Sequence, residues 1–148
     1  MSFPRDGAHH AAAPRCLRYT AVSYAKKNLR DVEDAAVKHG LSDHQEARFA
    51  RTDLGAEQTG LNYLIIKPAQ REAFAHRHGE AEEVYVVLAG SGRVKLDDEL
   101  VDLAPLDAVR VSPGVTRAFE ASRDGLEVLV FGPHVEGDVE MASDFWTE

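Results

Sequence analysis

Two histidines and a glutamate lie close together in the sequence, in a pattern that could hold a metal ion. His76 and His78 are separated by one residue, and Glu83 follows on what we predict to be the next strand. Residues two apart on a β-strand share a face, so both imidazoles would project together. If the next strand folds back as a hairpin, the Glu83 carboxylate meets both rings. Two imidazoles and one carboxylate leave open positions on a metal, which is typical of non-heme Fe(II) and also suits Mn or Zn.

Two interpretations of the same residues need no metal. His76 and His78 could be interior histidines that serve only for hydrogen bonding. Alternatively, one of them could act as the general base of an acid–base enzyme such as an epimerase.

The elements that must position these residues are predicted to be short strands. From about residue 46, short apolar or alternating runs follow one another, each closed by turn residues. No connection between these runs is long enough for a crossover helix, which excludes parallel βαβ units. The pattern therefore indicates an all-β sandwich or barrel. The expected strands are 47–54, 61–66, 74–78, 83–89, 93–96, 99–103, 108–111, 117–120 and 126–131.

The strand 83–89 is expected to lie in the centre of the sheet. It is apolar on both faces after its first residue, as expected of a strand buried on both sides. Tyr85 and Val87 would share a face with Glu83. Glu83 would then look into an enclosed space, where a carboxylate needs a partner.

Two local features lie around these strands. A helix is predicted over 29–39, capped by Asn28 or Asp31 and ended by Gly40 in a left-handed turn. Asp97 and Asp98 alone separate two strands, which predicts a tight two-residue hairpin.

At this point a family resemblance is visible. The segment 76–92, with its two histidines, its glutamate and Gly90, resembles the first conserved motif of the cupin superfamily. The segment 106–119, with Pro113 and Gly114, resembles the second motif, and the likeness covers roughly residues 60–132. It implies a single-domain cupin, a jelly-roll-like antiparallel β-barrel with a short N-terminal helix. It also implies a frequent homodimer and a metal held by both histidines, the glutamate and a second-motif histidine.

The second motif departs from the family pattern at the fourth metal ligand. Arg117 stands where the histidine is expected, and Leu106 replaces the opening glycine. Arginine has no lone pair to give to a metal. Without metal, Arg117 and Glu83 could form a buried ion pair. With metal, Arg117 could clamp a carboxylate or phosphate of the substrate.

The chain is expected to form one domain. Residues 1–18 are read as a flexible tail, and 19–148 as the cupin domain, with a core barrel over about 46–132 and a C-terminal anchor over 133–148. The tail holds the adjacent His9 and His10, read as no metal site, and Cys16, the one cysteine, which fits a reducing cytoplasm. The predicted substrate-binding residues are Arg117, Tyr63, Tyr85 and Phe119. Phe145 and Trp146 are expected to pack on the barrel or on a neighbouring subunit.

The bulk charge excludes some partners. A formal net charge of −8 argues against nucleic acid and against anionic membrane surfaces. The sequence shows no signal peptide and no apolar run of roughly 18 residues, so a cytoplasmic protein is expected.

The leading hypothesis from the sequence is a metal-dependent enzyme, an oxygenase or isomerase acting on a small anionic molecule. Its divalent Fe, Mn or Zn would act as a Lewis acid or bind dioxygen. The alternative is a non-enzymatic small-ligand-binding cupin, whose metal-free pocket is closed by an Arg117–Glu83 ion pair.

Overall fold

A computed structural model of the protein describes residues 23–147. The predictions for the tail, including His9, His10 and Cys16, lie outside the described residues. No helix within the described part of the chain has the length and apolar character needed to cross a membrane.

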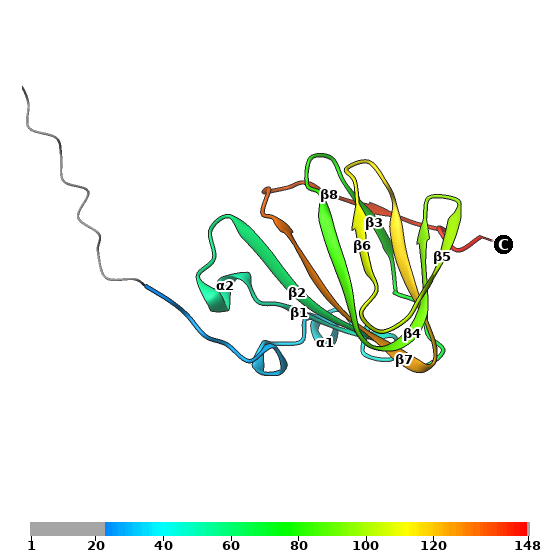
Figure 1. The fold of residues 1–148 in the computed structure, drawn as a ribbon, viewed down its shortest axis with the longest axis horizontal. Coiled ribbons are helices and arrows are strands. Elements are labelled where there is room, and N and C mark those ends of the chain that lie inside the picture. The colour runs from blue at the N-terminus through cyan, green and yellow to red at the C-terminus, as the bar shows by residue number, and fades with distance from the viewer. Residues whose placement is uncertain (1–22, 148) are drawn as a thin grey trace, which may run out of the picture.

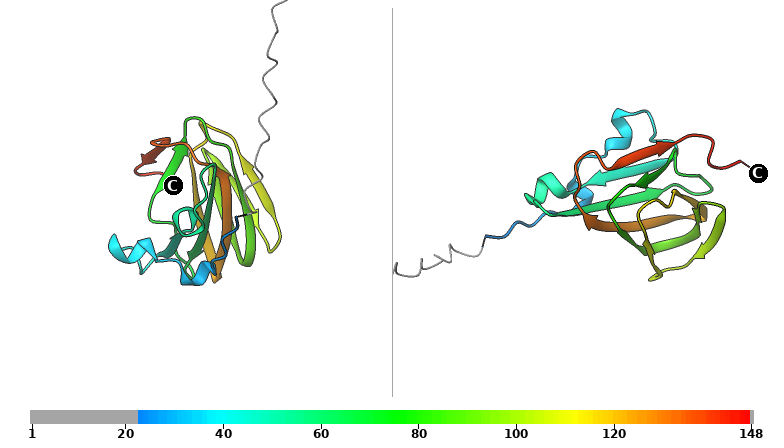
Figure 2. Two further views of the ribbon diagram at one scale, coloured as in Figure 1. Left: turned by 90° about the vertical axis from the view of Figure 1, so that its left-hand side faces the viewer. Right: turned by 90° about the horizontal axis from the view of Figure 1, so that it is seen from above.

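The described chain forms one curled, eight-stranded antiparallel sheet (Figure 1). Its order is β1-β2-β7-β3-β8, and β4 pairs with β5, β6 and β7. The strands curl around a common interior (Figure 2), which confirms the prediction of an all-β, jelly-roll-like barrel. The strands are β1 (Gln45–Phe49), β2 (Thr59–Ile66), β3 (Ala75–His78), β4 (Glu83–Leu96), β5 (Glu99–Leu103), β6 (Ala108–Val111), β7 (Arg117–Pro133) and β8 (Val139–Ala142).

The two longest strands, β4 and β7, each join two segments that we predicted as separate. The sequence prediction placed a turn at the glycines, but the chain continues through bulges between Val87 and Ala89 and between Gly90 and Gly92. Gly90 has a φ of 76°. A Cβ atom there would lie 2.1 Å from the carbonyl oxygen of Gly125, so only glycine permits this close approach. The two strands therefore bend together and contribute to both sides of the barrel.

The predicted helix over 29–39 is wrong as a single element. A 3₁₀ turn, η1 (Leu29–Asp31), and a short helix, α1 (Ala35–Lys38), replace it. Val32 between them has an extended backbone and is only 2% exposed, so the helical geometry is broken at this buried residue. The Asp34 carboxylate accepts from the amides of Ala36 and Ala47, which starts α1 and ties it to β1. Gly40 has a φ of 69° and ends this segment as predicted.

Three further strand predictions need correction. The run 47–54 is a strand only as far as Phe49. Ala50 already has helical geometry, and the run ends as a short helix, α2 (Arg51–Leu54). Strand β8 was missed because it is short and largely exposed. The strand 83–89 is central as predicted, but Leu88 is 43% exposed, so its outer face is not buried throughout. The hairpin at Asp97 and Asp98 is confirmed by the pairing of Leu96 with Glu99.

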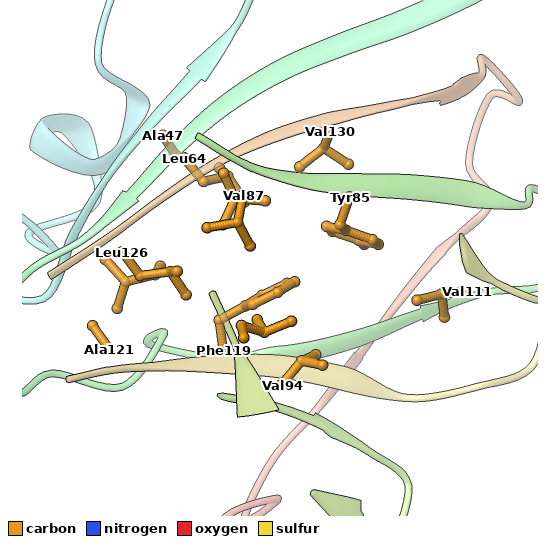
Figure 3. Close-up of a cluster of buried hydrophobic side chains, with 13 residues drawn as sticks. Ala47, Leu64, Tyr85, Val87, Val94, Val111, Phe119, Ala121, Leu126 and Val130 are labelled. Atoms are coloured by element: carbon orange, nitrogen blue, oxygen red, sulfur yellow. The ribbon is translucent and has the colours of Figure 1, made fainter. Parts of the chain in front are cut away.

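The core lies between the facing parts of the curled sheet (Figure 3). Tyr85 from β4 and Phe119 from β7 point toward each other, with ring centroids 5.1 Å apart. The buried cluster consists of Ala47, Leu64, Ile66, Tyr85, Val87, Val94, Leu103, Val111, Phe119, Ala121, Leu126, Val128 and Val130.

Candidate functional site

The predicted site residues lie at or next to the ends of three strands. His76 and His78 lie on β3, Glu83 begins β4, and Arg117 begins β7 directly opposite His76 in the β3–β7 register. The prediction of a hairpin between β3 and β4 is wrong, because β3 pairs with β7 and β8 instead. The turn after His78 carries the chain from one part of the sheet to another, so Glu83 meets the histidines across the interior.

Both imidazoles point at one oxygen of Glu83. The Nε2 atoms of His76 and His78 lie 3.9 and 3.3 Å from Glu83 Oε2. The two rings meet edge to face, with centroids 5.3 Å apart. The three side chains are 11 to 15% exposed, so the cluster is largely withdrawn from water.

Arg117 closes this cluster from behind. Its side chain is 0% exposed, and Nη2 donates to the same Glu83 Oε2 at 2.8 Å. Its Nε donates to the Tyr85 hydroxyl at 2.9 Å, and Nη1 to the Val115 carbonyl at 2.9 Å. The Tyr85 hydroxyl in turn donates to Glu83 Oε2. Every nitrogen of the guanidinium therefore has an acceptor within the protein.

These contacts set the charge state of the cluster. Burial alone would raise the pKa of Glu83, but the neighbouring His76, His78 and Tyr85 groups outweigh it and hold the pKa well below its ordinary value. Burial lowers the pKa of His76, and the nearby Arg117 charge acts in the same direction. Glu83 is therefore an anion paired with Arg117, and His76 is neutral at pH 7.

Asp138, which the sequence reading missed, holds the turn that links the histidines to Glu83. Its carboxylate accepts from the amides of Gly79, Glu80 and Ala81 at 2.8 to 2.9 Å. Its Oδ2 also lies 3.4 Å from His78 Nδ1. His78 thus lies between two carboxylates, one near each ring nitrogen. An acidic residue far from the motif in the sequence carries no spacing signal, so it could not be found there.

A cavity of about 270 Å³ opens beside the cluster. Its ionisable lining includes the cluster of His76, His78 and Glu83, and a second carboxyl group, Glu72. Most of the remaining lining is apolar. It comprises Gln45, Ala47, Phe49, Asn62, Leu64, Phe74, Tyr85, Val130, Val139 and Met141.

Of the four residues predicted to bind substrate, only one lines the cavity. Tyr85 lines the cavity. Tyr63 lies outside its lining, and its hydroxyl donates to Glu127. Phe119 packs against Tyr85 in the core rather than on the cavity wall. Arg117 lies behind Glu83 and is absent from the lining.

Glu72 is a second carboxyl group on this cavity that the sequence reading missed. It is 5% exposed, and its Oε2 accepts from the Phe119 amide at 3.1 Å. Burial raises its pKa to about 8, and a hydrogen bond from the Phe119 amide and the Arg117 charge offset this only in part. Glu72 precedes β3 in a segment with no periodicity, so no sequence pattern predicts that its side chain lines the cavity.

The C-terminal aromatic pair packs on the barrel. Lys95 Nζ lies 4.7 Å from the centroid of Phe145, and Arg71 Cζ lies 4.8 Å from that of Trp146. Lys95 Nζ also donates to the Phe145 carbonyl at 2.5 Å.

The three donor groups form a cluster that could hold a metal ion. One atom from each of His76, His78 and Glu83 lies within 4.8 Å of the others, and two imidazoles with a carboxylate are ordinary ligands for Fe, Mn or Zn. The difficulty is Arg117, because its charge lies 2.8 Å from the oxygen that both histidines face. In this arrangement the three side chains are suitable metal ligands, but the positive charge of Arg117 beside Glu83 Oε2 disfavours a metal cation at that oxygen.

Comparison with known proteins connects the chain to one family. Residues 62–131 match the family of cupin domains. A cupin protein from Bacteroides fragilis shares 18% identity over 84% of this chain and 95% of that chain, with a TM-score of 0.60. The polyketide cyclase RemF from Streptomyces resistomycificus shares 22% identity over 83% of this chain and 87% of that chain, with a TM-score of 0.65.

A third similar structure is larger. Oxalate decarboxylase from Bacillus subtilis shares 21% identity over 88% of this chain, with a TM-score of 0.69, but the match covers 35% of that chain. Another matched bacterial structure is covered over 64% of its length. At these identities the likeness concerns the fold. No curated protein matches the sequence.

Proposed function

We propose that the barrel cavity of this chain, which matches the family of cupin domains over residues 62–131, binds a small molecule, with a metal-free polar end closed by the Arg117–Glu83 ion pair. The observation that carries this proposal is the position of Arg117. Its fully buried guanidinium donates to the Glu83 oxygen that faces both histidines. A buried carboxylate with a cation at 2.8 Å is already neutralised, and a second cation at the same oxygen would be repelled.

In this proposal each residue at the polar end has a distinct role. Arg117 holds Glu83 as an anion and fixes the Tyr85 hydroxyl. Asp138 holds the turn that brings His78 to Glu83. The neutral His76 ring and the Tyr85 hydroxyl are then held rigidly at the cavity end, where they can orient an oxygen atom of a ligand.

A second candidate function is a metal-dependent enzyme, and the convergence of the His76, His78 and Glu83 donor atoms favours it. Those three side chains would hold the ion. When bound, a divalent metal would supply Lewis-acid chemistry or a binding site for dioxygen. Arg117 would then have to give up the Glu83 oxygen. The sequence suggested that Arg117 clamps an anionic substrate. Neither function assigns it this role, because Arg117 does not line the cavity.

Metal content distinguishes the two functions. The purified wild-type chain is incubated with Fe(II), Mn(II) or Zn(II), desalted, and analysed by elemental mass spectrometry beside Arg117→His. That variant removes the cation and places an imidazole at the fourth ligand position of the family motif. We expect no stoichiometric metal in the wild type and about one equivalent in Arg117→His, because the competing charge is gone.

Two control variants make the result specific. Adding His76→Ala and His78→Ala to Arg117→His should abolish the gained metal, whereas His39→Ala with His44→Ala changes only exposed histidines and should not. One equivalent of metal in the wild type, lost with His76 and His78, would replace our proposal with the metal-dependent function.

A further inference from the structure

The ionisable groups around the cavity give the first clue to the ligand. Among residues 23–147, no lysine or arginine lines the cavity. Within the described part of the chain, its two carboxyl groups are Glu83, already paired with Arg117, and Glu72, which accepts from the backbone amide of Phe119. An anionic ligand would find no side chain of fixed positive charge and would face two acidic residues.

The state of Glu72 points the same way. Burial raises its pKa to about 8, so the group is largely protonated and uncharged at neutral pH. Apart from the histidine cluster, this cavity wall then presents a protonated carboxyl group, two amide side chains and apolar surface.

The apolar wall continues beyond the cavity. A groove of about 410 Å³ runs beside α1 and is lined by Ala35, Ala36, His39 and Leu41. The cavity and the groove share five lining residues, Gln45, Ala47, Phe49, Phe74 and Met141. The cavity and the groove therefore adjoin, and most of the side chains that they share are apolar.

The rim of the cavity is apolar and open to solvent. Phe49, Val139 and Met141 are 52, 54 and 53% exposed, and all three line the cavity. Large apolar side chains that remain exposed around one opening mark a place where apolar surface is covered by a ligand.

We infer that the ligand is an uncharged amphipathic molecule, with a hydroxyl or carbonyl group at the His76, His78 and Glu83 end. Its hydrocarbon or aromatic body fills the cavity and extends into the groove beside α1. This inference rests on the proposed function, since it takes the cavity as the ligand site. It differs from the small anion suggested by the sequence, because Arg117, the residue expected to bind that anion, lies behind Glu83 and does not line the cavity.

A displacement assay tests the inference on the wild-type chain. The neutral fluorescent probe N-phenyl-1-naphthylamine is bound to the protein and displaced at neutral pH by hexanol, decanol or decanoate. Burial of each methylene should strengthen binding about 4-fold, so decanol should bind on the order of 100-fold more tightly than hexanol. Decanoate has the same length as decanol but carries a charge, and it should bind at least 10-fold more weakly than decanol.

Two variants locate the tail of the ligand. Ala35 lines the groove but not the cavity, so Ala35→Trp should fill the groove, weaken decanol at least 10-fold and leave hexanol within 2-fold. Val37→Trp is the matched control on the same helix, because Val37 is 64% exposed and does not line the groove. It should leave both alcohols unchanged.

The outcomes separate this inference from the proposed function. Tighter binding of decanoate than of decanol, or equal binding of hexanol and decanol, would overturn the ligand class while leaving a ligand-binding cavity. Equal loss of decanol in both tryptophan variants would overturn the path through the groove. No binding of the probe or of any of these ligands would overturn both the inference and the binding function.

Discussion

Two parts of the cavity wall each bury a carboxyl group, and their surroundings differ. Glu83 receives hydrogen bonds from Arg117 and Tyr85 and lies 3.3 Å from His78 Nε2. Glu72 accepts one backbone hydrogen bond, from Phe119. The pKa of Glu83 is lowered, while that of Glu72 is raised to about 8. Burial is common to both, so the number and charge of the donors determine which carboxyl group ionises.

The largest expected effect is the loss of the cation at Glu83. Arg117→Met should lower the free energy of unfolding by about 3–5 kcal/mol, because it leaves a buried charge without its partner. Urea denaturation followed by circular dichroism measures the change. Adding Glu83→Gln to Arg117→Met should recover part of the loss, since the unpaired charge is removed. A loss below about 1 kcal/mol in the single variant would mean that Glu83 does not depend on Arg117.

The next effect is a pH dependence that comes from Glu72. The pKa of this group is 4.5 ordinarily and about 8 in the folded chain, so the folded state holds more protons than the unfolded state between these values. The free energy of unfolding should therefore fall as pH rises from about 4.5 to 8. The total change is a few kcal/mol, since one pKa unit corresponds to about 1.4 kcal/mol.

Glu72→Gln should remove this slope and raise stability at pH 8. The exposed Glu57→Gln serves as the control and should leave the slope in place. Urea midpoints at closely spaced pH values decide the matter. Parallel curves for the wild type and Glu72→Gln would show that Glu72 is charged in the folded chain, and the contrast with Glu83 would disappear.

The smallest expected effect concerns the turn that joins the two histidines to Glu83. Asp138→Asn keeps one acceptor oxygen but loses the charge that three amides share, so a cost of about 1–2 kcal/mol is expected. Glu140→Gln is the comparison on the neighbouring strand. It breaks only the exposed pair with Arg77 and should cost less than about 1 kcal/mol. Equal costs for the two variants in urea denaturation would argue that Asp138 does not fix the turn.

The sequence identified the residues of the first motif, but it did not predict which strands bring them together. Alternation and turn residues predicted most strand positions, because these signals are local. The spacing of His76, His78 and Glu83 predicted a cluster, and they do converge, although by a crossing between parts of the sheet rather than by a hairpin. Strand pairing depends on contacts distant in the sequence, which periodicity does not record.

The residues that the sequence reading missed share one property. Glu72 and Asp138 lie outside the recognisable motifs and act through their three-dimensional neighbours. Tyr63 was expected on the cavity wall because it is aromatic, but its place in the alternation of β2 turns it toward Glu127. The exclusion of Arg117 from the cavity depends on packing alone. These features are set by the assembled barrel.

The pairing of β3 also bears on how the chain folds as it is synthesised. This strand carries both histidines, yet its ladder with β7 is limited to His76 and Arg117. Its other four pairs are with β8, and Arg77 meets Glu140 at a separation of 63 residues. Closing so long a loop is slow compared with forming the local hairpin at Asp97. The strand that carries the histidines can therefore complete its ladder only once residues 139–142 are available to pair with it.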